Sequence, residues 1–424
     1  MAGIYENVIA QAVGDGLLGE EQPLAAFVDV EGVRAAAQAL QTAFPSHFEH
    51  MFAAKANTMS RALRLVREAG MGCEVASPGE LEQALRAGFE PWEIVFDEPA
   101  KTWGVLRKVL ELGVNLNIDN FQEFERVASM ADRIQAARSI GFRLNPQVGA
   151  GRIGAMSTAT SSSKFGVALE DDGNREKIIA CYLDHPWMNS VHTHVGSQGC
   201  SLDMMAAGVR KAVELAGEIN ARLGARQVRT IDIGGGLPVN FESEEITPTF
   251  SDYAARLEQE APALFSGEYR VKTEFGRAVM AKSGFIVSRV EYTKVSGGRH
   301  IATTHAGAQV ATRTIFMPEH WKLRISAYGP DGRARQGEPV TQDIAGPLCF
   351  AGDMAGSGRD LPLIEPGDYV VLHDTGAYYF SNPFYYNALC APPVYGAERE
   401  QDQSVRFDCW RKSQSMDDML AVIG

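Results

Sequence analysis

Residues 72–97 read GCEVASPGELEQALRAGFEPWEIVFD, and this stretch carries the pattern of one strand–helix–strand unit. Short apolar runs stand at both ends of it, as expected for two buried strands. Between them, Ser77 and Glu80 form a capping-box signature around a proline at the first helical position, and Gly88 stands where helices often end in a left-handed residue. The stretch therefore predicts two parallel strands joined by a right-handed helical crossover.

The same alternation of apolar runs and helical patterns continues from about residue 26 to residue 280. Asn120 with Glu123 repeats the capping box, and Gly113 is a second helix-terminal glycine. About eight such units in this length fit a (β/α)8 barrel, and a doubly wound open sheet is the alternative that spacing alone leaves open. The candidate strands are Ala26–Val30, Met51–Ala56, Gly72–Ser77, Ile94–Asp97, Leu116–Asp119, Ile140–Pro146, Val191–Ser197, Thr230–Gly234 and Val271–Phe275.

Polar residues near the ends of these strands favour the barrel. In a barrel the C-terminal ends of all strands converge on one mouth, whereas in an open sheet they spread along an edge. The strand-end residues are Lys55, Glu74, Asp97, Asp119, Arg143, His194, Asp232 and Glu274. We therefore expect an α/β protein built on a (β/α)8 TIM barrel.

The pattern changes after about residue 282, where strand-like runs are separated by Gly/Pro turns and long helical periods are absent until the tail. These runs include Gly284–Val290, Tyr369–His373 and Val405–Cys409. They predict a mostly β second domain. We expect the barrel over residues 26–280, and the β domain over residues 1–25 and 281–424.

The composition excludes several classes of protein. The 424 residues are 45% hydrophobic and 22% charged, which is typical of a folded chain and not of a disordered one. A net charge of −13 disfavours nucleic acid as a partner. No apolar run approaches the roughly 18 residues of a membrane span, and the N-terminus lacks the pattern of a secretion signal. The six cysteines show no CxxC pair or zinc-finger spacing, so we expect reduced thiols in a cytoplasmic protein.

Two strand-end motifs could bind a reactive, phosphorylated molecule. Lys55 lies among apolar neighbours in Ala54-Lys55-Ala56-Asn57, where partial desolvation favours a nucleophilic amine that forms an imine with an aldehyde. Asp232-Ile233-Gly234-Gly235-Gly236 lets backbone N–H groups approach an anion, although it lacks the spacing of a Walker loop or a dinucleotide fingerprint. Taken alone, a surface lysine and a flexible turn are the simpler interpretations.

Two further motifs add groups for a flat cofactor. Glu274-Phe275-Gly276-Arg277 combines a carboxylate that can keep a pyridine nitrogen protonated with an arginine fork for phosphate. In a strand, His192 and His194 share one face, so the pair could bind a metal or stack on a ring. We expect no metal, because no cysteine or acidic ligand follows at a useful spacing.

The β domain contributes two motifs of its own. Gly346-Pro347-Leu348-Cys349, followed by Asp353, places a thiol on a loop, where it could donate or accept a proton. Asp374-Thr375-Gly376-Ala377-Tyr378 follows it along the chain.

Together and in this order, the motifs resemble those of the fold-type III pyridoxal-phosphate decarboxylases, which include diaminopimelate, ornithine and arginine decarboxylases. The resemblance implies a barrel of the alanine-racemase-like type, pyridoxal 5′-phosphate as cofactor, and decarboxylation of an amino acid or amino-acid conjugate. It suggests amino-acid, polyamine or secondary-metabolite biosynthesis, such as that of siderophores. The matching segments are Phe52–Asn57, Glu74–Leu81, Lys164–Gly166, His194–Gln198, Gly234–Gly236, Glu274–Arg277, Gly346–Cys349 and Gly376–Tyr378.

The resemblance also implies roles for the residues. Lys55 would bond to the cofactor aldehyde, His194 would stack on the ring, and Glu274 would pair with the pyridinium nitrogen. Glu74 would also belong to the cofactor site. Cys349 would come from the partner subunit of a head-to-tail homodimer and act near the reacting carbon. The first strand would join the C-terminal region in the second domain. The phosphate ligands would be Ser197, Gly235, Gly236, Arg277 and Tyr378, and Gly276 would also belong to the cofactor site.

Several positions depart from the family pattern. Phe350 stands after the motif cysteine, where diaminopimelate and ornithine decarboxylases carry an acidic residue, Glu74 replaces an aspartate, and an Arg-Pro-x-x-Tyr-like motif is reduced to Arg313–Met317. Because Phe350 cannot pair with a distal ammonium, we expect free lysine, ornithine and arginine to be poor substrates. Arg313 suggests a distal carboxylate or a larger acidic conjugate. Phe350, Arg313 and Asp353 are the candidate substrate contacts.

Two alternative functions share the motifs. An amino-acid racemase would use the same cofactor with two proton-transferring groups on opposite faces, but the Gly-Pro-Leu-Cys and Gly-Gly-Gly segments favour the decarboxylase. A non-catalytic homologue would have lost cofactor binding, which the presence of Lys55, His194, Glu274 and Arg277 disfavours.

Overall fold

Eight parallel strands close into a barrel in one of the two units into which the chain divides by contacts, Arg34–Val239 with Thr247–Val279. The computed structural model describes residues 2–134 and 138–424. The ring runs β5-β4-β3-β2-β10-β9-β8-β6 and closes where β5 pairs with β6. Its strands are β2 Phe48–Ala53, β3 Gly72–Val75, β4 Ile94–Phe96, β5 Asn115–Ile118, β6 Ile140–Asn145, β8 Ser190–Thr193, β9 Thr230–Asp232 and β10 Arg270–Glu274, with β7 Val167–Ala168 paired outside the ring. The barrel, and not the open sheet, is confirmed.

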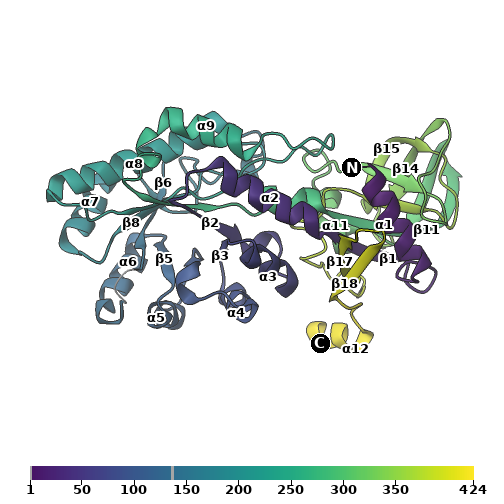
Figure 1. Cartoon of the computed structure of the whole chain (residues 1–424), viewed down its shortest axis with the longest axis horizontal. Coiled ribbons are helices and arrows are strands. Elements are labelled where there is room, and N and C mark those ends of the chain that lie inside the picture. The colour runs from purple at the N-terminus through teal and green to yellow at the C-terminus, as the bar shows by residue number, and fades with distance from the viewer. Residues whose placement is uncertain (1, 135–137) are drawn as a thin grey trace. The chain divides into compact units, whose positions relative to one another are not determined.

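Helices cover the outside of this ring, as Figure 1 shows. The predicted caps form: Ser77 Oγ accepts from the Glu80 amide at the start of α4, and Asn120 Oδ1 accepts from the Glu123 amide at the start of α6. Gly88, with φ of 99°, ends α4 in the left-handed region. The helices are α3 Ser60–Glu68, α4 Pro78–Ala87, α5 Trp103–Leu112, α6 Phe121–Ala128, α7 Asn174–Asp184, α8 Leu202–Leu223, α9 Phe250–Glu260 and α10 Arg277–Met280, and α2 Val30–Ala43 crosses the unit boundary.

The second unit, Met1–Val33 with Asn240–Ile246 and Met280–Gly424, is mostly β. The main path of its sheet is β15-β14-β12-β11-β1-β17-β18, with β16 paired to β11 and β13 paired to β16. Its elements are α1 Ala2–Gly14, β1 Leu24–Asp29, β11 Gly284–Ser296, β12 Arg299–Thr304, α11 Ala308–Phe316, β13 Ile325–Tyr328, β14 Pro339–Ala345, β15 Met354–Pro362, β16 Tyr369–Leu372, β17 Val394–Arg399, β18 Val405–Arg411 and α12 Met416–Ile423.

The first strand lies in this second sheet and not in the barrel. β1 pairs antiparallel with β11 and parallel with β17, so the candidate strand Ala26–Val30 belongs with the C-terminal region, as the family resemblance implied. The division by contacts falls between Val33 and Arg34. Helix α11 interrupts a region in which only strands were expected before the tail.

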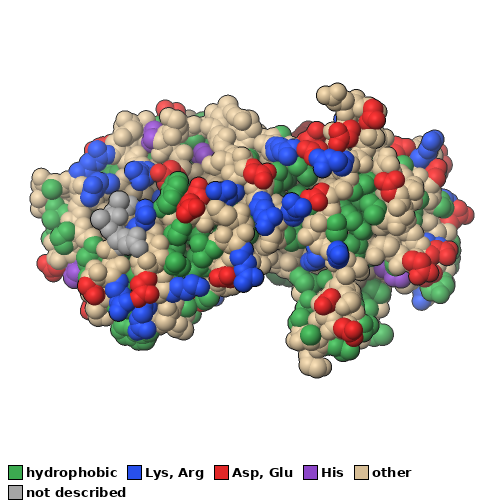
Figure 2. Space-filling model, turned by 60° about the horizontal axis from the view of Figure 1, so that its bottom comes forward, with side chains coloured by type: hydrophobic (Ala, Val, Ile, Leu, Met, Phe, Trp, Pro, Cys, Tyr) green, Lys and Arg blue, Asp and Glu red, His purple; other side chains and the backbone are tan. Residues whose placement is uncertain are grey.

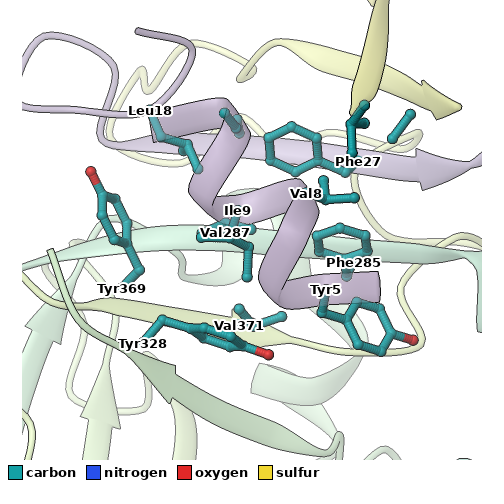
Figure 3. Close-up of a cluster of buried hydrophobic side chains, with 14 residues drawn as sticks. Tyr5, Val8, Ile9, Leu18, Phe27, Phe285, Val287, Tyr328, Tyr369 and Val371 are labelled. Carbon is teal, nitrogen blue, oxygen red and sulfur yellow. The ribbon is translucent and has the colours of Figure 1, made fainter. Parts of the chain in front are cut away.

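Helix α1 covers part of the core of the second unit. Figure 3 shows Tyr5, Val8 and Ile9 of α1 facing Phe285 and Val287 of β11, and the Tyr5 and Phe285 ring centroids lie 5.0 Å apart, edge to face. These buried aromatic and aliphatic side chains contribute about 1.5–3 kcal/mol each. This packing holds helix α1 against the sheet formed by the C-terminal region.

Surface charges of both signs and unpaired cysteines are further features of the described residues. On the face shown in Figure 2, basic and acidic side chains are interspersed. Within residues 2–134 and 138–424, no helix has both the length and the apolar character that crossing a bilayer requires. All six cysteines are free.

Candidate active site

A lysine–carboxylate contact marks the mouth of the barrel. Lys55 sits in a single 3-10 turn, Ala54–Ala56, directly after β2, and its Nζ donates to Glu74 Oε2 at 2.8 Å. Glu74 is fully buried on β3, paired in register with Ala53, while the Lys55 side chain stays 40% exposed. The carboxylate therefore orients an amine that a molecule entering from solvent can reach.

Glu274 ends β10 next to β2, in register with Met51. Its side chain is buried, and Oε1 has no hydrogen-bond partner among the described residues. Burial raises the pKa of Glu274 well above its usual range, and the nearby Glu74 and Asp97 carboxylates raise it further. A buried acceptor without a partner costs about 1–3 kcal/mol, so this oxygen is suited to a donor that a ligand supplies.

The three glycines after β9 bring the backbone close to its neighbours. A Cβ on Gly236, whose φ is +96°, would stand 1.8 Å from the Gly196 carbonyl oxygen, and one on Gly235 would stand 1.9 Å from the Glu274 carbonyl oxygen. The Gly235 amide donates to His194 Nδ1 at 3.1 Å. No residue with a side chain fits these two positions in this conformation.

His194 and Arg277 border the glycine turn. His194 is partly exposed, and burial of its ring lowers its pKa well below the usual range, so the imidazole is neutral. Arg277 begins α10 and donates from Nη2 to Ser197 Oγ at 3.4 Å. The barrel unit thus gathers Lys55, Glu74 and Glu274 with these neighbours, as the strand-end pattern predicted.

A layer of charged side chains lines the barrel interior beneath them. The strand register pairs Arg143 with His192, His192 with Asp232, and Asp232 with Lys272, and all four are buried. Burial and the neighbouring Glu274 raise the pKa of Asp232 to about 7. The sequence placed Arg143 and Asp232 at strand ends without giving them roles, and it did not single out Lys272.

Tyr378 lies in the second unit, in a turn held by buried charges. Asp374, with φ of +61°, and Tyr378, with φ of +68°, are both in the left-handed region. Arg324 donates to both Asp374 oxygens at 3.0 and 3.1 Å, and Lys282 Nζ lies 3.3 Å from Oδ2. This buried ion cluster fixes the turn that precedes Tyr378.

Cys349 is exposed on a loop of the second unit that Asp353 holds in place. Asp353 is buried, and its two oxygens accept from the Ala308 and Leu348 amides at 2.8 Å each. Burial raises the pKa of Asp353. With both oxygens engaged, Asp353 positions the Cys349 loop and is not presented as an open substrate contact.

Phe350 is half-buried in a cluster of aromatic side chains whose other members are exposed. Its ring stacks on Phe316 with centroids 5.5 Å apart and an interplanar angle of 14°. Phe384 and Tyr386 complete the cluster through edge and stacked contacts. The position after the motif cysteine is therefore apolar in its surroundings as well as in its own side chain.

Arg313 lies on α11 between two aromatic rings. Its guanidinium carbon is 4.2 Å from the Tyr378 ring centroid and 5.1 Å from that of Trp321. Nη1 is buried without a hydrogen-bond partner among the described residues, and burial lowers the pKa of Arg313. Arg313 and Tyr378 are thus brought together within the second unit.

The residues of the barrel mouth fit pyridoxal phosphate. The turn at Gly235 and Gly236 packs against the Glu274 and Gly196 carbonyls too closely for side chains, and glycine-rich turns of this kind commonly present backbone amides to a phosphate. Glu274 presents a buried, unpartnered oxygen that a ring nitrogen can fill, and the Lys55 amine is accessible to an aldehyde.

Comparison with known proteins identifies the family. Residues 30–281 match the model of the pyridoxal-dependent decarboxylase, pyridoxal binding domain. Diaminopimelate decarboxylase of Pseudomonas aeruginosa is 30% identical over 84% of this chain and 82% of its own length, and that of Pseudomonas fluorescens is 32% identical over 79% and 78%. The structure of diaminopimelate decarboxylase from Helicobacter pylori complexed with L-lysine superposes with a TM-score of 0.83 at 24% identity, covering 97% of this chain and 99% of that one, which shows the fold.

These relatives give the racemase alternative no support, and they confirm the resemblance read from the motifs. The chain belongs to the pyridoxal-dependent decarboxylases and is a pyridoxal-phosphate-dependent carboxy-lyase that acts on an amino acid or an amino-acid conjugate.

Proposed function

We propose that Lys55 is the residue that bonds to the aldehyde of pyridoxal phosphate and that the surrounding barrel mouth is the decarboxylation site. The observation that carries this assignment is the 2.8 Å contact between Lys55 Nζ and the buried Glu74 carboxylate. Lys55 is the strand-end lysine that stays accessible, whereas Lys101 is fully buried in an ion pair with Glu123.

We assign the other barrel residues to different parts of the cofactor. We assign the phosphate to the turn of Gly235 and Gly236 beside Gly276, with Ser197 and Arg277 as its donors. The 3.4 Å contact between Ser197 and Arg277 supports a shared anion site. His194 lies beside this turn with a neutral ring that can stack on a flat ligand. Glu274 supplies the carboxylate for the ring nitrogen.

The bound cofactor supplies an electron sink for the pair left when CO2 departs. Glu74 holds the Lys55 amine in place, and Glu274 holds a proton at the ring nitrogen. The neutral ring of His194 adds no positive charge above the cofactor ring. Each of these residues acts through preorganised position, which is worth most in a site that excludes water.

We assign substrate choice to Arg313 and Phe350 of the second unit. A lysine-like ammonium buried beside Phe350 without a partner would cost several kcal/mol, and cation–π attraction to the aromatic cluster offsets only about 0.5–2 kcal/mol of it. Arg313 Nη1 is a buried donor without a partner, which suits a carboxylate. The preferred substrate therefore carries a distal acidic group, as an acidic amino acid or an acidic conjugate does.

Tyr378 and Cys349 complete the proposal as residues of a site shared between the subunits of a homodimer. The exposed thiol on a loop anchored by Asp353 supports a role for Cys349 in proton transfer at the reacting carbon. We place the enzyme in the cytoplasm, because six free cysteines fit a reducing compartment.

The assignment of Lys55 is tested by the absorbance spectrum of the purified enzyme. Lys55→Ala should lose the near-visible band of the covalently bound cofactor and nearly all CO2 release, while Lys108→Ala, on the exposed face of α5, should keep both. A Lys55→Ala protein with an unchanged spectrum would show that another lysine holds the cofactor.

The substrate assignment is tested by kcat/KM for ornithine, lysine, meso-diaminopimelate and a glutamate-derived conjugate. The wild-type enzyme should prefer the conjugate, Arg313→Gln should remove that preference, and Phe350→Glu should shift the ranking toward the diamino acids. Phe350→Leu, which stays apolar, is the matched control. Efficient turnover of lysine or ornithine by the wild-type enzyme would contradict the assignment.

A further inference from the structure

Four buried ionisable side chains form a line through the barrel interior. Arg143 Nη1 lies 2.5 Å from Asp97 Oδ2, Asp97 Oδ1 lies 3.7 Å from His192 Nδ1, and His192 Nε2 lies 3.4 Å from Glu274 Oε2. They come from β6, the end of β4, β8 and β10, and no side chain in the line is more than 7% exposed. The line therefore connects a permanent cation to the carboxylate that faces the cofactor ring.

His192 is the unexplained member of this line. It is fully buried, and neither ring nitrogen makes a hydrogen bond among the described residues, although a carboxylate oxygen faces each of them. An apolar side chain of similar size would avoid the cost of two unsatisfied nitrogens. Contacts that are close but poorly aligned without a ligand are typical of groups that act only when the ligand is bound.

A metal site is the competing explanation, because ligand atoms of Asp97, His192 and Glu274 lie within 4.8 Å of one another. The guanidinium of Arg143 already neutralises Asp97 at 2.5 Å and would repel a cation placed between these ligands. Glu274 is also the carboxylate assigned to the ring nitrogen, so a metal would compete with the cofactor.

We infer that His192 is a positioning residue that bridges Asp97 and Glu274 and carries a proton on each ring nitrogen when the cofactor is bound. The inference rests on the proposed role of Glu274. Arg143, Asp97, His192, Glu274 and the protonated cofactor ring then alternate in charge. Nε2–H donates to Oε2 and orients the carboxylate, so that Oε1 meets the ring nitrogen.

The surroundings of His192 set the protonation of the free protein. Burial lowers the pKa of His192, the Asp97, Asp232 and Glu74 carboxylates raise it in part, and Arg143 lowers it. Glu274, whose pKa burial raises, also senses Lys55 and Arg143, and Lys272 lies near Asp232 and Glu274. Burial thus disfavours a charged His192 in the free protein, and formation of the alternating line requires the bound cofactor to reverse this preference.

The test compares two ligands, pyridoxal phosphate and its 1-deaza analogue, in which CH replaces the ring nitrogen. Dissociation constants are measured by equilibrium dialysis and absorbance for the wild type, His192→Gln, His192→Asn, Glu274→Gln and the His192→Gln/Glu274→Gln double variant. His50→Gln is the matched control, because His50 is a buried barrel histidine that bonds to Thr273 at 2.9 Å.

We expect His192→Gln and His192→Asn to weaken pyridoxal phosphate binding about 10- to 100-fold, as loss of a charge-assisted hydrogen bond predicts. Binding of the deaza analogue should change less than threefold, the double variant should be no weaker than Glu274→Gln alone, and His50→Gln should leave both constants unchanged. Because both ligands are measured on the same variant, a general loss of stability cannot imitate this difference.

Each contrary result has a definite meaning. Equal weakening of both ligands in the His192 variants would reduce His192 to a structural role and overturn the inference. If Glu274→Gln weakened pyridoxal phosphate binding selectively and His192→Gln did not, the inference would be overturned and the proposed function would stay intact. If Glu274→Gln weakened both ligands equally, the proposed role of Glu274 would be removed. Saturable Zn²⁺ binding that His192→Gln abolishes would replace the inference by a metal site.

Discussion

Substitution of Asp374 by asparagine tests whether the buried ion cluster holds the turn that carries Tyr378. Asp374 is fully buried, receives both arms of Arg324 at 3.0 and 3.1 Å, and lies 3.3 Å from Lys282 Nζ. Asparagine keeps the shape of the side chain and tolerates the positive φ of 61°, so the change removes the charge and little else.

The expected loss of stability follows from the two cations, Arg324 and Lys282, that remain after the carboxylate is removed. Two cations, with side chains 13% and 18% exposed, would face a neutral amide in place of a carboxylate. Breaking a buried pair by removing one charge costs about 3–5 kcal/mol. For a unit of this size, each kcal/mol lowers the melting temperature by roughly 2–4 °C, so we expect the transition of this unit to fall by about 6 °C or more.

Asp331→Asn is the matched control in the same unit. Asp331 and Arg333 lie 3.8 Å apart with side chains 67% and 77% exposed, and such pairs contribute about 0–1 kcal/mol. Thermal and urea unfolding of both variants, followed by tryptophan fluorescence and circular dichroism, measure the difference, and dialysis measures cofactor retention. If the two variants unfold at the same temperature, the cluster does not fix the turn and the reasoning is refuted.

Three further predictions follow from the same structure. Mixing Lys55→Ala with Cys349→Ala subunits should restore up to about a quarter of wild-type activity if the site is shared across a dimer; no recovery despite demonstrated subunit exchange would place both residues in one subunit. Gly236→Ala should abolish cofactor retention measured by dialysis, because its Cβ would stand 1.8 Å from a carbonyl oxygen. Burial lowers the pKa of His50 to about 4 and that of His373 to about 3 from 6.5, so the unfolded state binds more protons between these values. Stability should therefore rise with pH from about 4 to 6.5, and urea unfolding at pH 5 and 7 should show a smaller difference in His50→Gln.

The barrel was predictable because its signals are local. The capping residues Ser77 and Asn120 and the terminal glycine Gly88 determine where helices begin and end within a few residues of chain, and the structure places them as expected. The pairing partner of β1 could not be predicted in this way, because it lies far away in the sequence. Its pairing with β11 joins Phe27 to Phe285, and nothing within Ala26–Val30 distinguishes a barrel strand from one that pairs with a distant segment.

The site was predictable to the extent that strand ends converge. This geometry brings Lys55 to Glu74 and sets Glu274 beside β2. Strand-end geometry could not show that both oxygens of Asp353 accept hydrogen bonds from backbone amides. One of these amides belongs to Leu348 in the same loop, and the other belongs to Ala308, which is distant in the sequence. Nor could it show that Arg313 lies on the Tyr378 ring, because helix α11 carries no strong cap and gave no signal.

The charges of the barrel interior explain why this mouth suits a cationic ring. Desolvated carboxylates without matching cations are costly, which is why burial raises the pKa of Glu274 well above its usual range and that of Asp232 to about 7. With pyridoxal phosphate bound as proposed, a protonated ring nitrogen beside Glu274 would add a positive charge to this buried space. The buried carboxylates would then favour the protonated form of the ring, with Glu274 as the point of contact that we propose. The residues that take part are the carboxylates Glu74, Asp97, Asp232 and Glu274 and the bases Lys55, Arg143, His192 and Lys272.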